Sequence, residues 1–469
     1  MAVLKRHLEY VIEAHLACGD KGAAMQTLHH FETQNNILPQ RAYTRVISSY
    51  IAGTTRRTNS PTPQADKAIA WDLLAHMRLI AHPVPSRSTY NAILLSCADP
   101  QDPQPERALD LLIEMEQDSQ ITPDGETFDA AILACSRVKG FYLEGFKLLK
   151  RMLGMHQSAL SAKRFITTQD GAGTQEYGAT GYEPTLTTFN ALLEGCKRRG
   201  DLSRTRWLLG EVLRLIQGGA GRGVDEEMVV NVLQCYAAFK PVIKREDVKV
   251  SSTISPGSST DDRVEDVKQA QSGFDAAHPP DAVEVDPIQH TMSDSRPLTL
   301  FDVASADFKP PSGPQTSLEA LQEAERLFQV VMHSQGDQAS PFGFLKPSTR
   351  VVNAYLSVKF SHGDLPDAIE TWQQIWERPI LKEAGVAKNG WSYISLFERC
   401  ASARQGEERS AVAGILTAAW QEYLEWDAAV GRQLRAIPAQ NAWSSMMRLG
   451  GGPRQVEQAW IHCIRSLAL

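Results

Sequence analysis

The side chains that most often carry out catalysis or bind metals are present, but none of their usual arrangements occurs. The 469 residues include 12 histidines and 7 cysteines, yet there is no Cys-x-x-Cys pair, no His-Glu-x-x-His segment and no Cys/His cluster with zinc spacing. A phosphate-binding Gly-x-x-x-x-Gly-Lys-Ser/Thr loop and a Gly-x-Ser-x-Gly nucleophile turn are also missing. We therefore predict no enzyme, no metal site, no cofactor and no site assembled from histidines.

What does recur is a hydrogen-bonding residue directly after an aromatic or aliphatic one, at the head of an amphipathic segment. In most copies a proline lies five residues before the aromatic or aliphatic residue. Three cysteines, Cys97, Cys135 and Cys196, each follow the polar residue by six positions, and this period predicts small buried side chains in successive helices. The recurring polar residues are Asn91, Asp129, Asn190, Asn231 and Asn353.

Pairs of amphipathic segments must position these residues. Each opening segment is followed by a short polar or Gly-containing turn and a second segment, such as 108–115, 145–152 or 368–375, with apolar residues at three- and four-residue spacing. This pattern predicts helix–turn–helix units. A single hairpin cannot bury both apolar faces, so its neighbours must cover it. The predicted fold is all-α, a right-handed α-solenoid of about nine helix–turn–helix units, with the clearest unit at 349–389.

Composition divides the chain into three parts. We expect an N-terminal repeat array at 1–240 with irregular loops at 53–65 and 154–181, and a C-terminal array at 317–469 with degenerate capping repeats. Between them, 241–316 is acidic, rich in Pro and Ser, and predicted to be disordered because it is poor in apolar residues.

This insertion is expected to split one unit. Residues 227–240 would form its first helix and 317–332 its delayed partner. The insertion is interpreted either as an expanded surface loop, which stability tolerates, or as an acidic segment that occupies the binding face or docks a partner.

Bulk properties favour a soluble protein without a membrane span. The net charge is −7, the pI is about 6.0 and the mean hydropathy is −0.28. No run of about 18 apolar residues occurs. The first residues enter a helical pattern without a clear targeting presequence. The global charge is not the basic signature typical of nucleic-acid binding, although most of the acidic excess lies in the insertion.

Four of these features together resemble the pentatricopeptide-repeat family, most closely its fungal and animal mitochondrial members. They are Tyr90-Asn91 at the head of a first helix, Gly363-Asp364-Leu365 at a turn, Ala108 with Leu112 and Met115 in a second helix, and Pro123-Asp124 at a repeat end. The Trp-Leu-Gly-Tyr signature of tetratricopeptide repeats is absent.

The resemblance implies that each repeat contacts one base of single-stranded RNA through a first-helix residue and a repeat-end residue. The resemblance also places Ser86 and Glu226 at the repeat-end position. Asn and Asp have an alternative role, in which they satisfy free backbone groups at helix starts. The base-contact candidates are Asn91, Asp124, Asp129, Thr185, Asn190, Asn231, Ser348, Asn353 and Asn389.

Lys and Arg at first-helix ends are candidates to contact phosphate. Such cations can instead complement a helix dipole. The position that holds a base-stacking apolar residue in the family carries Ser88, Glu126, Thr187 and Arg350 here. The phosphate-contact candidates are Arg137, Lys139, Lys197, Arg198 and Arg199.

Two functions follow from the resemblance. The first is an organellar RNA-binding protein, located in the mitochondrial matrix and acting as a monomer in transcript processing, stability or translation. The second is a protein-binding scaffold for mitochondrial ribosome or respiratory-complex assembly. The Asn/Asp series favours RNA, while the near-neutral array and the missing stacking residues favour a protein partner.

Overall fold

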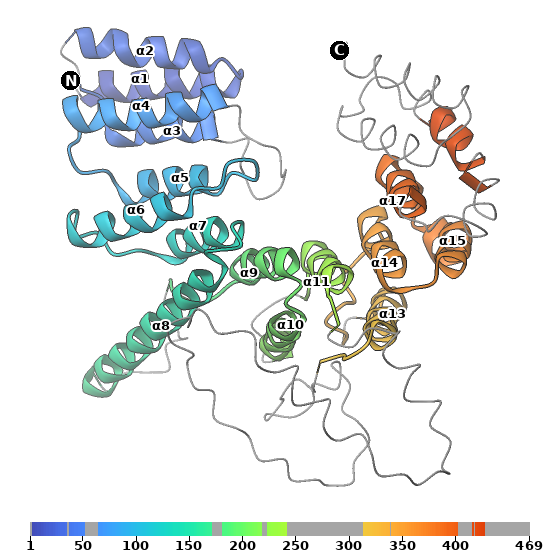
Figure 1. Ribbon diagram of the computed structural model, residues 1–469. Helices are drawn as coiled ribbons and strands as arrows, with labels where there is room; N and C mark the ends of the chain where they lie inside the picture. The colour runs from blue at the N-terminus through green and yellow to red at the C-terminus, as the bar shows by residue number, and fades with distance from the viewer. Residues whose placement is uncertain are drawn as a thin grey trace, which may run out of the picture.

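The computed structural model is built from helices throughout its described part (Figure 1). It describes residues 2–34, 37–51, 64–170, 181–217, 223–241, 313–337, 339–401, 415–416 and 418–426. Sixteen delimited α-helices and one short 3-10 helix lie within these ranges, residues 415–416 and 418–426 are also helical, and the ranges contain no strand.

The helices form hairpins, each with a first and a second helix. The first helices are α1 (Ala2–Ala17), α3 (Gln40–Ile51), α5 (Arg87–Cys97), α7 (Gly125–Ser136), α9 (Leu186–Arg199), α11 (Glu226–Ala238), α14 (Thr349–His362) and α17 (Gly390–Ala401). The second helices are α2 (Lys21–Thr33), α4 (Gln64–Ile80), α6 (Pro105–Gln117), α8 (Tyr142–Asp170), α10 (Leu202–Gln217), α13 (Ser317–His333) and α15 (Leu365–Gln374), the last followed by η2 (Ile375–Glu377) and α16 (Pro379–Glu383).

Each first helix packs on the first helix before it and the one after it, while the second helices cover the outside of this row. In Figure 1 the row bends: α1 to α7 and α13 to α17 stand on either side of α9 and α11. The predicted all-α solenoid is confirmed. Seven complete hairpins and α17 lie within the described ranges, and the expected total of about nine extends into residues outside them.

Polar residues at the helix starts set the register of the row. Ser86, Asp124, Asp225 and Ser348 are N-caps whose side chains accept a hydrogen bond from the backbone N–H three residues later. Thr185 caps α9 in the same position. Such caps satisfy backbone donors that the first helical turn leaves free. The predicted turn at Gly363-Asp364 is also confirmed, because it separates α14 from α15.

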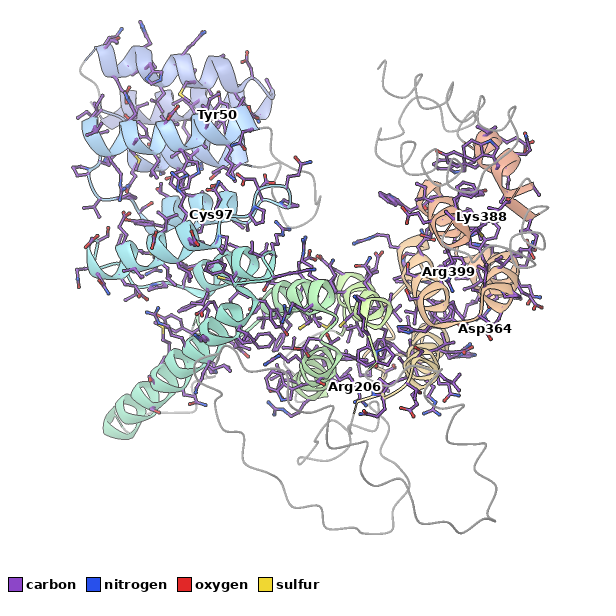
Figure 2. The ribbon with its side chains drawn as sticks, in the orientation of Figure 1. Tyr50, Cys97, Arg206, Asp364, Lys388 and Arg399 are labelled. Carbon is purple, nitrogen blue, oxygen red and sulfur yellow. The ribbon has the colours of Figure 1, made fainter. Side chains whose placement is uncertain are left out.

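The unit split by the insertion closes as predicted. Helix α13 packs beside α11 and α14 although 242–312 intervene in the sequence. A buried ion pair fixes it to the preceding unit: Arg206 Nε and Nη2 of α10 lie 3.0 and 2.9 Å from Glu323 Oε1 of α13. Figure 2 shows Arg206 at this contact. Burial raises the pKa of Glu323 even though Arg206 opposes the shift.

One predicted loop is wrong in part. Residues 154–170 were expected to be irregular, but α8 continues to Asp170. The stretch contains no proline, and a single Gly154 costs a helix only about 1 kcal/mol relative to Ala. Residues 171–180, together with 52–63 and 242–312, lie outside the described residues, so the remaining loop and insertion predictions stay predictions.

The periodic cysteines lie in the core, as predicted. Cys97, Cys135 and Cys196 are fully buried, and burial raises the pKa of the Cys97 and Cys196 thiols to about 11. Among the tryptophans, Trp372 and Trp420 are buried, while Trp391 is about half exposed.

Within the described ranges, no helix is both long enough and apolar enough to cross a bilayer.

Candidate nucleic-acid interface

The predicted base-contact residues meet in pairs between neighbouring repeats. At the α5–α7 contact, Asn91 Nδ2 donates to Asp124 Oδ1 at 3.2 Å, and Thr127 Oγ1 donates to Asn91 Oδ1 at 2.7 Å. Asp124 and Thr127 also form the capping box of α7. The amide of Asn91 therefore uses both its donor and its acceptor to hold the start of the next first helix.

The α14–α17 contact has the same arrangement. Asn353 Nδ2 donates to Asn389 Oδ1 at 3.1 Å, and Ser392 Oγ donates to Asn353 Oδ1 at 2.8 Å. Asn389 in turn accepts from the backbone N–H of Ser392. We call this set of three side chains the repeat clasp. It consists of the amide, the N-cap residue of the next first helix, and the hydroxyl three residues after that cap.

Other joints carry part of the clasp. Thr188 Oγ1 donates to Asp129 Oδ1 at 2.5 Å between α7 and α9. Asn190 Nδ2 donates to Asp225 Oδ2 at 2.8 Å between α9 and α11. Thr44 and Thr89 share a 2.7 Å hydrogen bond between α3 and α5. The candidate side chains are thus largely buried and hydrogen-bonded to protein, the arrangement expected of the alternative, structural role.

The structure corrects the register at α11. Glu226 was assigned to the repeat end, but Asp225 is the N-cap of that helix. The candidate amide follows the N-cap by five residues in α5, α9 and α14, whereas Asn231 follows Asp225 by six. Asn231 instead accepts a 2.9 Å hydrogen bond from Lys197 Nζ. The Asp225 signal was visible in the sequence, because Asp is a favoured cap residue.

At the α11–α14 joint, Ser348 is engaged differently. Its hydroxyl donates to Glu226 Oε1 at 2.8 Å, and Arg350 lies 3.8 Å from the same oxygen. No hydroxyl follows three residues after Ser348, where Val351 lies buried.

Two phosphate-contact candidates are paired with one carboxylate. Lys197 Nζ lies 2.5 Å and Arg198 Nη2 2.9 Å from Glu194 on the same helix. Burial raises the pKa of Glu194, but the charges and hydrogen bonds of Lys197 and Arg198 outweigh burial and hold that pKa below its usual value. One carboxylate therefore offsets only one of the two positive charges at this point of the row.

The other three candidates differ. Arg137 caps the C-terminus of α7 and is 8% exposed, and burial lowers its pKa. Its Nε and Nη1 atoms are buried without a hydrogen-bond partner among the described residues. Lys139 and Arg199 are exposed, and no ion pair joins either of them to another described residue. None of these three forms an ion pair with another described residue.

Elsewhere along the first helices, cations face acids. Arg41 and Arg45 of α3 pair with Glu9 and Glu13 of α1. A cleft of about 890 Å³ lies between α7 and α9. The charged residues in its lining are four carboxylates and one cation: Asp124, Glu126, Asp129, Glu183 and Arg87. A continuous positive track does not run along the described part of the row.

The prediction that no site is assembled from histidines stays a prediction, but two histidines do lie beside one carboxylate. His29 of α2 and His76 of α4 converge on the carboxylate of Glu32. No local motif predicts this arrangement, because His76 lies 44 residues after Glu32 and the three side chains meet only in the folded chain.

No protein-family model matches the sequence, and no curated protein matches it. Similar solved structures include the pentatricopeptide repeat protein PPR10 in complex with an 18-nucleotide psaJ RNA element, at 16% identity and a TM-score of 0.42, covering 98% of this chain and 50% of that one. A form with three cysteines replaced, in complex with the same RNA element, gives the same values. PPR10 from maize is 15% identical over 97% of this chain and 62% of that one, with a TM-score of 0.28.

This chain spans about half the length of the first two structures. Likeness at this level carries no argument about function, which depends on the chain's own residues. Those residues define an α-helical repeat protein whose first helices form one continuous row joined by polar contacts.

Proposed function

We propose that the chain binds single-stranded RNA along its row of first helices. The observation that carries the proposal is the recurrence of one hydrogen-bonding position, at Asn91, Asp129, Asn190 and Asn353, beside the start of the next first helix. Amide and carboxylate groups at a regular spacing suit the edges of bases splayed from a single strand. To contact a base, these groups would exchange clasp hydrogen bonds for bonds to RNA.

Charge at the ends of the first helices supports the same ligand. Arg137, Lys139 and Arg199 lack ion pairs among the described residues, and they lie at or just beyond the C-terminal ends of α7 and α9. Contacts to phosphate require such cations and give binding a dependence on salt.

The test replaces three exposed cations, Lys139, Arg198 and Arg199, with Ala and measures RNA affinity at several salt concentrations. For single strands each phosphate contact steepens the fall of log affinity with log salt by roughly 0.7, so losing three reduces the magnitude of this slope by about 2. The matched control replaces Lys147, Lys150 and Arg151 of α8, which are equally exposed but lie on a second helix. Equal slopes for both triple variants would contradict the proposal.

A protein partner is the second candidate, and the pairing of cations with acids along the row favours it. Arg41 with Glu9, Lys197 with Glu194 and Arg350 with Glu226 leave much of the row near neutrality. Absence of binding to any single-stranded RNA at low salt would favour this candidate. Deletion of 245–312 tests whether the acidic segment competes with RNA. If it does, the deletion variant should bind RNA more tightly than the full chain.

The finer role forms part of the proposal: action as a monomer on organellar transcripts in the mitochondrial matrix, in processing, stability or translation. The resemblance of the repeat motifs supports it. Imaging of a C-terminally tagged full-length protein against a mitochondrial marker, with RNA crosslinking from the same cells, tests both location and transcript.

A further inference from the structure

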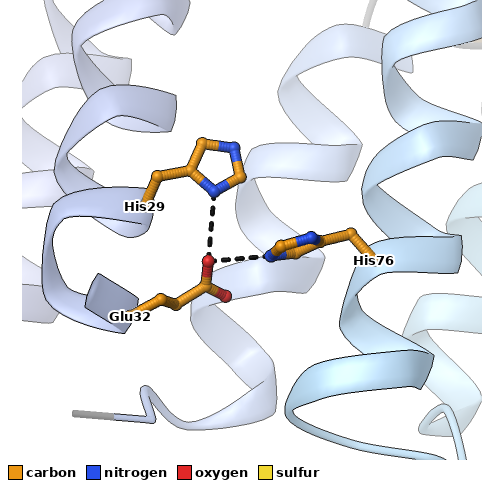
Figure 3. A group of neighbouring side chains, drawn as sticks. All are labelled: His29, Glu32 and His76. Carbon is orange, nitrogen blue, oxygen red and sulfur yellow. Dashed lines mark hydrogen bonds and ion pairs between the residues drawn. The ribbon is translucent and has the colours of Figure 1, made fainter. Parts of the chain in front are cut away.

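Three metal-ligating side chains converge between the second helices of the first two hairpins. His29 and Glu32 lie three residues apart on α2, which places them on one helix face, and His76 comes from α4. Figure 3 shows both imidazoles directed at the same carboxylate.

The distances fit a small metal ion. Glu32 Oε2 lies 3.1 Å from His29 Nδ1 and 2.8 Å from His76 Nε2, and all three ligand atoms lie within 4.8 Å of one another. Zinc–ligand bonds of about 2.1 Å place the donors of a tetrahedral site roughly 3.4 Å apart. Small side-chain adjustments therefore bring the three donors to bonding distance of one ion.

The surroundings orient the carboxylate and leave room for a fourth ligand. Tyr43, which is fully buried, donates its hydroxyl to the other oxygen of Glu32. Supporting contacts of this kind fix metal ligands in place. His29 and His76 also line a cleft of about 580 Å³ with Gln26 and Asp72, so water or a further oxygen donor can reach the open position.

We propose that His29, Glu32 and His76 form a binding site for a zinc-class transition-metal ion. Two imidazoles and a carboxylate are the donors that such ions prefer. The ion links α2 to α4 and so joins the first repeat to the second on the face opposite the row of first helices. The proposal stands independently of the ligand bound by that row.

The experiment titrates the full chain with Zn²⁺ against a chromogenic chelator, and with Co²⁺ followed by visible absorption. We expect a wild-type site that shows the absorption bands of four-coordinate Co²⁺. His29→Ala and His76→Ala should each weaken Zn²⁺ binding at this site by at least about 100-fold, and Tyr43→Phe by about 10-fold, the range for supporting residues being about 10–100-fold.

His30→Ala is the matched control, because His30 is exposed, lies next to His29, and its ring hydrogen-bonds to Gln34 and not to Glu32 or His76. It should leave affinity unchanged. Glu32→Gln keeps the shape of the side chain, removes its charge and should weaken binding. Hydrogen exchange in 21–33 and 64–80 should slow on addition of Zn²⁺ in the wild type and in His30→Ala, but not in His29→Ala or His76→Ala. No Zn²⁺ binding, or binding of equal affinity and stoichiometry in His29→Ala and His76→Ala, would overturn the proposal.

Discussion

The α5–α7 and α14–α17 joints are built alike, although they lie on opposite sides of the α9–α11 joint, which is incomplete. In the first two, the amide of Asn91 or Asn353 has both a donor and an acceptor contact. In the third, Asn190 donates to Asp225, but its Oδ1 is buried without a partner among the described residues.

The difference comes from one position, the third residue after each N-cap. Thr127 and Ser392 supply a hydroxyl there, while α11 has Met228. A hydroxyl at this site serves its own helix as part of the cap and the preceding helix as a donor to the amide. The comparison teaches that the cap residue and the third residue after it together decide how a repeat is joined to its neighbour.

The largest expected effect on stability concerns the contact between α10 and α13. The Arg206–Glu323 ion pair lies there, beside the α9–α11 joint that has an incomplete clasp. Glu323→Ala leaves the guanidinium of Arg206, 4% exposed, without its carboxylate. Removing one partner of a buried pair costs about 3–5 kcal/mol. Chemical denaturation followed by circular dichroism should show this loss in the free energy of unfolding.

Glu325→Ala is the control for this variant. Glu325 lies on the same helix and pairs with Lys359 at 3.8 Å, but its side chain is 41% exposed, so about 1 kcal/mol or less is expected. Equal losses in both variants would mean that the Arg206–Glu323 contact does not hold α13 in place.

A smaller effect separates complete from incomplete clasps. Asn91→Ala and Asn353→Ala each remove two inter-repeat hydrogen bonds and should cost about 1–3 kcal/mol. Asn190→Ala removes one bond and also an unsatisfied oxygen, so its cost should be lower by about 1 kcal/mol. Hydrogen exchange of the flanking first helices gives the local opening free energy in each case. The same cost at all three positions would dismiss the role given to the hydroxyl.

The smallest effect is a dependence on pH at the α5–α7 joint. Burial raises the pKa of Asp124, but hydrogen bonds from Thr127 and Asn91 and the charge of Arg87 outweigh burial and hold that pKa below its usual value. As pH falls, Asp124 therefore binds a proton in the unfolded chain before it does so in the folded chain. Its contribution to the free energy of unfolding is complete above the unfolded pKa of about 3.9. That contribution is lost as pH falls through the lower folded pKa.

Asp124→Asn should flatten that part of the acid limb. Stability would be measured from pH 5 down to pH 3, and parallel curves for the wild type and the variant would show that Asp124 does not contribute to it.

The fold could be predicted from the sequence because each repeat unit is formed mainly by segments that are close together in the chain. Tyr90-Asn91 and Phe128-Asp129 mark first helices through hydrophobic periodicity, and the split unit was recognisable because α13 keeps an amphipathic pattern of its own. The sequence did not reveal that Asn91 contacts Thr127, because that bond depends on the packing of successive helices. The sequence prediction ends helix α8 too early, because the Gly- and Thr-rich composition of 154–181 is typical of a loop whereas the helix continues to Asp170.

The pairing of charges was equally hidden. Lys197, Arg198 and Arg199 are adjacent in the sequence, yet two of them share Glu194 and the third is exposed. Helix geometry makes the Glu194 contacts foreseeable from their three- and four-residue spacing. The convergence of His76 on Glu32 was not foreseeable, since it requires the relative placement of two hairpins.

Packing of each first helix only on its two neighbours has a consequence for how the molecule comes apart. The free energy of unfolding is then approximately a sum of one term for each unit and one term for each interface between neighbouring units. A unit with only one neighbour has one boundary to lose where an inner unit has two, so units with a single neighbour should unfold first. A cross-link between two neighbouring units would raise the free energy needed to separate them.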